Sequence, residues 1–130
     1  MPSNHRLETA STPAARILDL PFANNPYPMW VFDSTTLTFL DVNDAAIQQY
    51  GYSREEFLHM TIADIRPDED VPRLRQETAH PHSSTGEQWR HRRKDGTVFP
   101  VAITSWQIVF HGTTAELVLA RPTQPSQDPV

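Results

Sequence analysis

Histidines have the widest chemical repertoire of the side chains in this sequence, and three of them stand near one another. His80 and His82 flank Pro81, and His91 follows in the next predicted strand. Alternate histidines on an extended segment can share a metal ion, but no third acidic or histidine ligand stands at a recognisable spacing. Surface loop histidines are therefore the simpler interpretation of the pair, and a single strand histidine such as His91 usually completes a hydrogen bond. The sequence predicts no metal site.

The residues needed for nucleophilic or phosphate chemistry are missing. The chain has no cysteine, which excludes thiolate nucleophiles, zinc ribbons, iron–sulfur clusters and any flavin held by a cysteine adduct. Its glycines are scattered and build no phosphate-binding loop, and no serine stands in a nucleophile elbow. The acidic run at residues 68–70 adjoins prolines and arginines, a polar setting that suits a helix start better than acid–base catalysis. The sequence predicts a protein that is not an enzyme.

The composition indicates which binding partners and which cellular compartment to expect. The 130 residues carry a formal net charge of -5, which argues against a dedicated nucleic-acid binder. The short basic run at residues 90–94 is interpreted as the solvated side of a strand. Apolar runs are far shorter than a bilayer requires, and no signal peptide pattern opens the chain. We expect a soluble, cytoplasmic domain that binds neither nucleic acid nor membrane.

Hydrophobic periodicity and capping residues predict strands at both ends of the domain and short helices between them. Alternating segments predict strands at residues 29–32, 37–42, 87–93, 98–110 and 114–120. Capping residues and helical spacing predict helical segments at residues 13–20, 43–50, 61–65 and 68–78, with another starting at Ser53. This order predicts an α+β fold, a five-stranded antiparallel sheet with short helices packed on one face.

The same patterns divide the chain into four parts. We expect a disordered tail at residues 1–12, a short flanking helix with a linker at 13–24, a folded domain at 25–121 and a proline-rich disordered tail at 122–130.

Four separated blocks of sequence resemble the PAS domain, a sensory module of signalling proteins. In chain order they are NPYPMWVFD (25–33), DVNDAA with YGYSREEF (41–57), DVPR (70–73) and HRRKDGTVFPV (91–101). The resemblance covers roughly residues 25–121 and is carried by the four blocks at these spacings. It implies a small module that binds a cofactor or metabolite between sheet and helices, or that pairs with another protein.

Two arguments predict the lining of such a pocket. Alternation along the strand from residue 98 places Phe99, Val101, Ile103 and Ser105 on its more apolar face, which should lie toward the helices. By resemblance to light-sensing PAS domains, the same cavity is approached by Trp30, Phe32, Trp89, His91, Leu117, Leu119 and Arg121. The result is an apolar chamber in which His91, Ser105 and Arg121 are the hydrogen-bonding groups. Large aromatic side chains on a sheet face also fill cores, so a fully packed interior is the alternative interpretation.

The resemblance also bears on cofactors. The haem-binding branch of the family places a histidine inside the connecting helix, and the matching segment at residues 73–77 has none, so haem is not expected. A cysteine-adduct flavin is excluded, whereas a non-covalent flavin or another flat aromatic ligand stays open. No cofactor is assigned.

The other face of the sheet predicts a contact with a second protomer. Alternation puts Met29, Val31 and Trp106 on that face, where an apolar patch should be covered. The helix expected at residues 13–20 is the natural cover, from the same chain or from a second copy. We therefore predict a homodimer with an interface that includes Ile17, Leu18, Met29, Val31 and Trp106.

The sequence thus predicts a PAS-like sensor or interaction module in signal transduction, with output by dimer rearrangement. It would bind a small molecule in the chamber, or a protein partner such as a signalling effector domain. A ligand-free dimerisation module is the first alternative. A small cone-shaped α+β enzyme of the isomerase or dehydratase type is the second, and among the predicted pocket residues only His91 could be its base.

Overall fold

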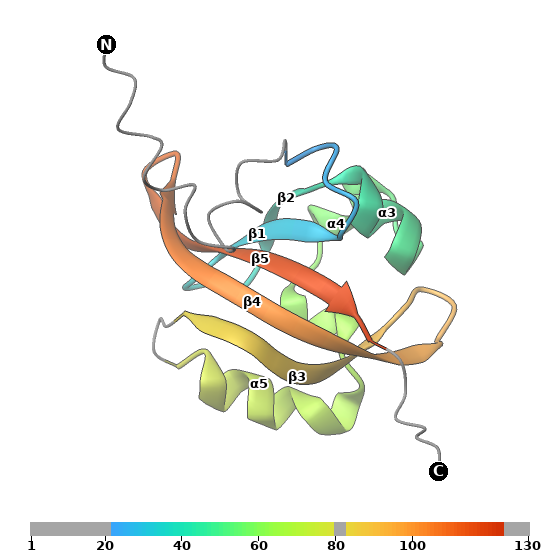
Figure 1. Cartoon of the computed structure of the whole chain (residues 1–130). Helices are drawn as coiled ribbons and strands as arrows, with labels where there is room; N and C mark the ends of the chain where they lie inside the picture. The colour runs from blue at the N-terminus through green and yellow to red at the C-terminus, as the bar shows by residue number, and fades with distance from the viewer. Residues whose placement is uncertain (1–21, 80–82, 124–130) are drawn as a thin grey trace.

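Residues 22–79 and 83–123 are described by the computed structural model, in which five antiparallel strands carry short helices on one face (Figure 1). The strands are β1 (Met29–Asp33), β2 (Phe39–Val42), β3 (Ser84–Arg92), β4 (Val98–Phe110) and β5 (Thr113–Pro122). Between β2 and β3 lie α3 (Asp44–Tyr50), α4 (Arg54–Phe57), the 3-10 helices η2 (Ile62–Ile65) and η3 (Asp68–Asp70), and α5 (Val71–Glu77). The predicted α+β fold is confirmed. The helix predicted at residues 13–20 lies outside the described residues.

Asp33 builds the turn between β1 and β2. Its Oδ1 accepts hydrogen bonds from the backbone N–H groups of Thr35 at 2.7 Å and Thr36 at 3.0 Å. Aspartate favours such turns because its short side chain can bond the backbone just ahead of it. The two strands pair antiparallel with Trp30 opposite Val42, which confirms the predicted hairpin.

Asn43 links β1 to the first helix. Its side chain is 0% exposed, and its Oδ1 accepts from the N–H of Ala46 at 3.0 Å, which caps α3, and from the N–H of Met29 at 2.9 Å. Its Nδ2 donates to the carbonyls of Phe22 and Tyr27, both at 3.0 Å. Because the amide uses its acceptor and both donors, Asn43 fixes where β1 lies relative to α3.

Local start or stop signals bound α3, α4 and η2. Ser53 and Glu56 form a capping box at α4, and Thr61 and Asp64 form another at η2. Helix α3 ends at Gly51, whose φ of 88° is in the left-handed region that glycine adopts without a Cβ clash. The predicted capping box at Ser53 and the glycine stop are confirmed, while the helix expected at residues 68–78 divides into η3 and α5.

The last strand in the chain lies in the middle of the sheet. The strand order is β2-β1-β5-β4-β3, and β5 pairs with β1 on one side and β4 on the other. Val118 of β5 is opposite Trp30 of β1 and also opposite Ser105 of β4. Directly opposed residues in a sheet share a face, so this register fixes which β5 side chains meet the helices.

Aromatic rings dominate the core between the sheet and the helices. The Trp30 ring packs edge-on against Phe39 and Tyr50 at centroid distances of 5.7 and 5.6 Å, and Tyr50 packs against Phe99 at 5.3 Å. Such edge-to-face pairs add to the stabilisation that apolar burial provides. The same buried cluster also contains Phe32, Val42, Ala46, Phe57, Ile62, Ile65, Leu74, Trp89, Val101, Ile103, Val118 and Ala120.

The opposite face of the sheet is also apolar. Met29 and Val31 are only 2% and 4% exposed within the single chain, whereas Trp106 is half-buried. Met29 is opposite Leu119 and Val31 is opposite Leu117, so all four side chains share this face, as alternation predicted for Met29 and Val31. In residues 22–79 and 83–123, no helix has the length and apolar character that crossing a bilayer requires.

Candidate functional site

A small cavity lies between the sheet and the segment from η2 to α5. Its volume is about 40 Å³, which is space for only a few atoms. The apolar part of the lining comes from both layers and comprises Trp30, Phe32, Ile62, Leu74, Trp89, Ile103 and Val118. The polar part comprises Arg66, Glu77, Thr78, Ser84, Glu87, Ser105 and Glu116. Apolar walls with a few converging polar groups are typical of small-molecule sites.

Arg66 is the buried cation of this cavity. It is 5% exposed, and its Nη1 donates a hydrogen bond to the carbonyl of Ile62 at 2.7 Å. Its Nε is buried and has no hydrogen-bond partner in the described part of the chain. Burial lowers the pKa of Arg66 to about 10, which leaves the guanidinium charged at neutral pH.

Two guanidinium groups lie over the indole of Trp89, which is 6% exposed. The Arg66 carbon Cζ is 4.7 Å from the ring centroid, and that of Arg73 is 3.7 Å from it. Arg73 is partly exposed, and its Nη2 also lies 3.4 Å from Oε2 of Glu87. Cations are attracted to the face of an aromatic ring, so Trp89 helps to orient both arginines.

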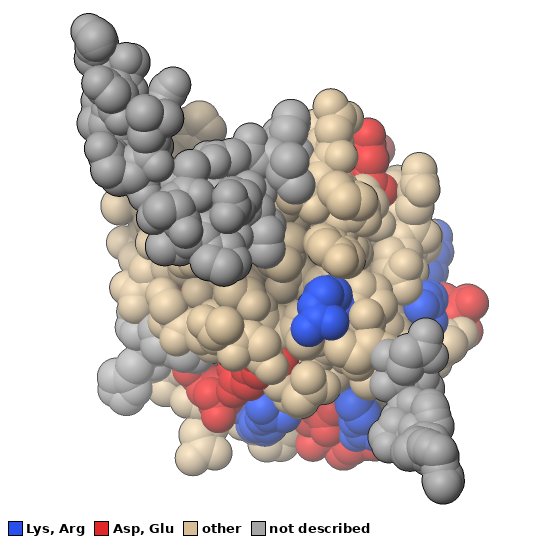
Figure 2. All heavy atoms as spheres, viewed as in Figure 1, with Lys and Arg blue, Asp and Glu red and all other residues tan. Residues whose placement is uncertain are grey.

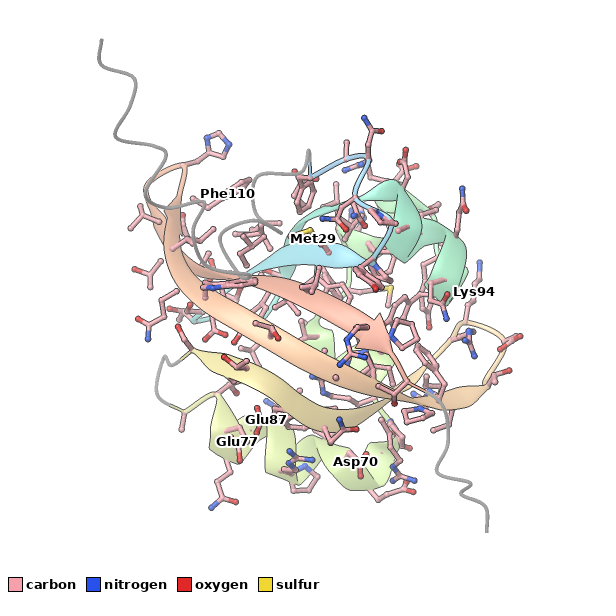
Figure 3. The ribbon with its side chains drawn as sticks, in the orientation of Figure 1. Met29, Asp70, Glu77, Glu87, Lys94 and Phe110 are labelled. Atoms are coloured by element: carbon pink, nitrogen blue, oxygen red, sulfur yellow. The ribbon has the colours of Figure 1, made fainter. Side chains whose placement is uncertain are left out.

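Three carboxylates line the same cavity. Glu77 of α5 and Glu87 of β3 are half-buried, and Figure 3 labels both on these neighbouring elements. Glu116 of β5 is 4% exposed and stands opposite Phe32 of β1. Among the described residues that line the cavity, Arg66 is the one cation, so a multiply charged anion is disfavoured in this space.

Elsewhere in the core, His91 and Tyr50 form a buried pair. Both are 0% exposed, and Oη of Tyr50 lies 2.6 Å from Nδ1 of His91. Burial lowers the pKa of His91 well below its ordinary value, and the charge on Arg66 lowers it further, so the imidazole is neutral. Its Nε2 has no hydrogen-bond partner among the described residues. His91 therefore completes a hydrogen bond inside the core and does not line the cavity.

The structure places the predicted pocket residues in three different settings. Cavity-lining positions are held by Trp30, Phe32, Trp89, Ile103 and Ser105. The same sheet face, but not the cavity lining, holds His91, Phe99 and Val101. The opposite sheet face holds Leu117, Leu119 and Arg121.

The prediction for Leu117, Leu119 and Arg121 was wrong by one residue. Leu117 is opposite Val31, and Arg121 is opposite Ala102, so these side chains point away from the helices. A one-residue offset moves a whole set of strand side chains to the other face. Because apolar residues occupy both faces of this central strand, its sequence did not indicate which set meets the helices. That set is Glu116, Val118 and Ala120.

Arg66 and Glu116 are the buried ionisable residues among the cavity positions that the sequence did not reveal. The other lining residues that were not predicted are Ile62, Leu74, Glu77, Thr78, Ser84, Glu87 and Val118. Arg66 lies between Ile65 and Pro67 at the end of η2, a segment too short for its periodicity to define a buried face. Glu116 stands among apolar residues of β5, where a single carboxylate looks like an outward-facing position. Only the register of β5 against its neighbours shows that Glu116 faces the helices, and the register cannot be read from the composition of the strand.

Ion pairs connect β3 to η3 at the surface. Nη2 of Arg90 lies 2.9 Å from Oδ1 of Asp70 and 3.2 Å from Oε2 of Glu69. Figure 2 shows charged side chains gathered along the edge where β3 and α5 lie. The hydrogen bond from Arg90 lowers the pKa of Asp70. Arg90 is exposed, so the structure places this part of the basic run on the solvated side of β3.

Metal ligands do not gather in the described ranges, where no group of three or more histidine and acidic side chains could hold an ion. His80 and His82 lie outside those ranges.

Comparison with known proteins agrees with this architecture. The PAS domain of an HTR-like protein from Haloarcula marismortui superposes with a TM-score of 0.70 at 21% identity, covering 92% of this chain and 96% of that one. A PAS domain from a two-component sensor histidine kinase gives 0.63 at 25% identity, covering 92% and 99%. The PAS domain of a LuxR-family transcriptional regulator from Burkholderia thailandensis, in complex with ethanol, gives 0.61 at 14% identity, covering 78% and 92%. No curated protein matches the chain.

The family comparison covers most of the sequence. A model described as a PAS domain matches residues 26–120, which includes every strand start and every helix of the described fold. The chain therefore belongs to the PAS domain family, the sensor modules of signalling proteins.

Proposed function

We propose that this PAS domain senses a small molecule bound in the cavity between the sheet and the η2–α5 segment. The observation that carries the proposal is a space of about 40 Å³ that has apolar walls and a buried, incompletely bonded Arg66. Packed interiors seldom leave polar groups without partners beside a void, so these features together favour a binding site. The complex of a related PAS domain with ethanol is a precedent for a ligand of this size in the fold.

The size of the cavity limits the class of ligand. A space of about 40 Å³ does not accept a flavin or another flat polycyclic molecule in this arrangement of side chains. The site is therefore proposed for a ligand of a few heavy atoms, and we propose no redox or catalytic role for it.

The output of the module is proposed to be a rearrangement of a homodimer in a cytoplasmic signalling protein. Ile17 and Leu18 of the predicted interface lie outside the described residues. Of its described members, Met29 and Val31 are already buried within one chain, so the half-buried Trp106 is the one that a second protomer would reach. Light scattering after size exclusion tests this part, and a monomer at tens of micromolar would count against it.

Ligand binding is tested by recording amide NMR spectra of the full chain with a library of small acids, alcohols and amines. We expect binders to shift the signals of Trp89, Ile103 and Ser105. Ser105→Leu fills the cavity and should abolish these shifts, whereas Thr104→Leu, next to it on the opposite sheet face, should preserve them. If no compound perturbs cavity residues, the ligand-free dimerisation module replaces the sensor as the better interpretation.

A further inference from the structure

Arg66 is a buried cation that lacks a contacting anion. Its Nε has no hydrogen-bond partner, and within the described ranges it forms no ion pair. The carboxylates that line the same cavity, Glu77, Glu87 and Glu116, therefore do not supply a direct partner. A buried charge is costly unless a counter-charge or a full set of hydrogen bonds accompanies it.

We propose that the cavity binds a short aliphatic monocarboxylate, whose carboxylate pairs with the guanidinium of Arg66. This proposal rests on the ligand-binding function proposed above and names its chemical class. A guanidinium presents its N–H groups in a planar fork that matches the two oxygens of a carboxylate. The Ile62 carbonyl accepts a hydrogen bond from Nη1, while Nε has no partner among the described residues.

The walls of the cavity determine the rest of the ligand. Trp30, Ile103 and Val118 are apolar and suit a hydrocarbon tail, and the volume of about 40 Å³ keeps that tail short. Phosphate and dicarboxylates carry a second negative charge, for which the described lining offers no second cation besides Arg66. An amine would place a second cation beside the buried guanidinium of Arg66.

Isothermal titration of the full chain at fixed ionic strength tests this class with four probes: propionate, 1-propanol, propylamine and inorganic phosphate. For so few heavy atoms we expect a dissociation constant for propionate of about 1 mM or somewhat tighter. Because charge-assisted hydrogen bonds are among the stronger ones, propionate should bind at least about tenfold tighter than 1-propanol. Propylamine and phosphate should bind more weakly than propionate.

Two arginine variants supply the matched comparison. Arg66→Gln should weaken propionate binding about tenfold or more and weaken 1-propanol binding much less, because a hydroxyl oxygen carries no charge. Arg73→Gln removes the other guanidinium over Trp89 and should change propionate binding by less than about threefold, since Arg73 is partly exposed. If Arg66→Gln does not fold, the Nε–H signal of Arg66 in the unmodified protein is followed instead, and propionate should shift it.

The outcomes separate this proposal from the broader function. If 1-propanol binds as tightly as propionate, or the Arg66 Nε–H signal does not respond to propionate, the carboxylate proposal is overturned while ligand sensing stands. Tighter binding of phosphate or propylamine overturns it in the same way. If none of the four probes binds and the NMR library also yields no binder, both proposals are overturned.

Discussion

The hydroxyl of Tyr50 lies 2.6 Å from Nδ1 of His91, and neither side chain is exposed to solvent. Tyr50 is the last residue of α3 and His91 lies near the end of β3, so this hydrogen bond joins the helical layer to the sheet. Losing one partner of a buried hydrogen bond costs more than the net energy of that bond, because the other partner is left unsatisfied inside the core.

Removing the Tyr50 hydroxyl should destabilise the fold. We expect Tyr50→Phe to lower the free energy of unfolding by about 1–3 kcal/mol, because Nδ1 of His91 loses its partner inside the core. Urea unfolding of both proteins measures the difference. Tyr52→Phe is the control, because Tyr52 is only half-buried against Phe57, and it should cost less than about 0.5 kcal/mol. Equal losses in the two variants would contradict a specific role for the hydroxyl.

Stability should fall as the solution becomes mildly acidic. The pKa of folded His91 lies well below the ordinary value near 6.5, which the unfolded chain recovers. Above about pH 6.5 both states carry neutral imidazole, and below it only the unfolded state takes up the proton. The free energy of unfolding should therefore decrease by up to about 1.4 kcal/mol per pH unit between pH 6.5 and the folded-state pKa.

Two measurements check this pH dependence. Unfolding at pH 7.5, 6.0 and 5.0 should show a flatter profile for His91→Gln, whereas the exposed His59→Gln should keep the slope of the unmodified protein. Imidazole NMR of the unmodified protein should show His91 still neutral at pH 6. Titration of His91 near pH 6.5 would refute the prediction even if the variant fails to fold.

The amide of Asn43 should matter more than an ordinary helix cap. We expect Asn43→Ala to lower the free energy of unfolding by about 2–4 kcal/mol, because it removes the α3 cap and three further hydrogen bonds to backbone groups, one of them buried and two part-buried. Ser53→Ala removes an exposed cap and should cost about 1 kcal/mol. Thermal and urea unfolding measure both variants, and a loss no greater than that of Ser53→Ala would exclude the linking role of Asn43.

The ion pairs of Arg90 should make a small, salt-dependent contribution. Arg90→Gln should lower the melting temperature slightly in low salt, because Asp70 and Glu69 lose their partner, and the difference should shrink in 1 M NaCl. Arg75→Gln on α5 is the control, since Arg75 is exposed and forms no ion pair with the described residues. A salt-independent loss for Arg90→Gln would mean that its hydrocarbon stem, and not its charge, stabilises the fold.

Local signals were sufficient to predict most of the fold. The Asp33 turn, the Asn43 cap, the Ser53 capping box and the Gly51 stop each depend on a few adjacent residues, and each occurs as expected. The helix expected at residues 68–78 divided because Pro72 at the start of α5 lacks the N–H that a continuous helix needs.

The candidate site was less predictable because it depends on tertiary register. Alternation identified the inner face of β4 correctly, since Phe99, Val101 and Ile103 alternate with smaller or more polar residues. In β5 apolar residues occupy both faces, so only its pairing with β1 and β4 reveals that Glu116 faces the helices. Arg66 reaches the cavity through the path of a four-residue 3-10 helix, which has no sequence period.

The central position of β5 also determines when the sheet can be completed during synthesis. As the chain leaves the ribosome, the edge of β1 that faces away from β2 stays open until residues 113–122 emerge, because its partner in the described sheet is β5. A nascent chain stopped before that point exposes the two edges that β5 later covers, one on β1 and one on β4, and such edges are templates for foreign strands. Chaperone demand should therefore peak just before the final hairpin is released.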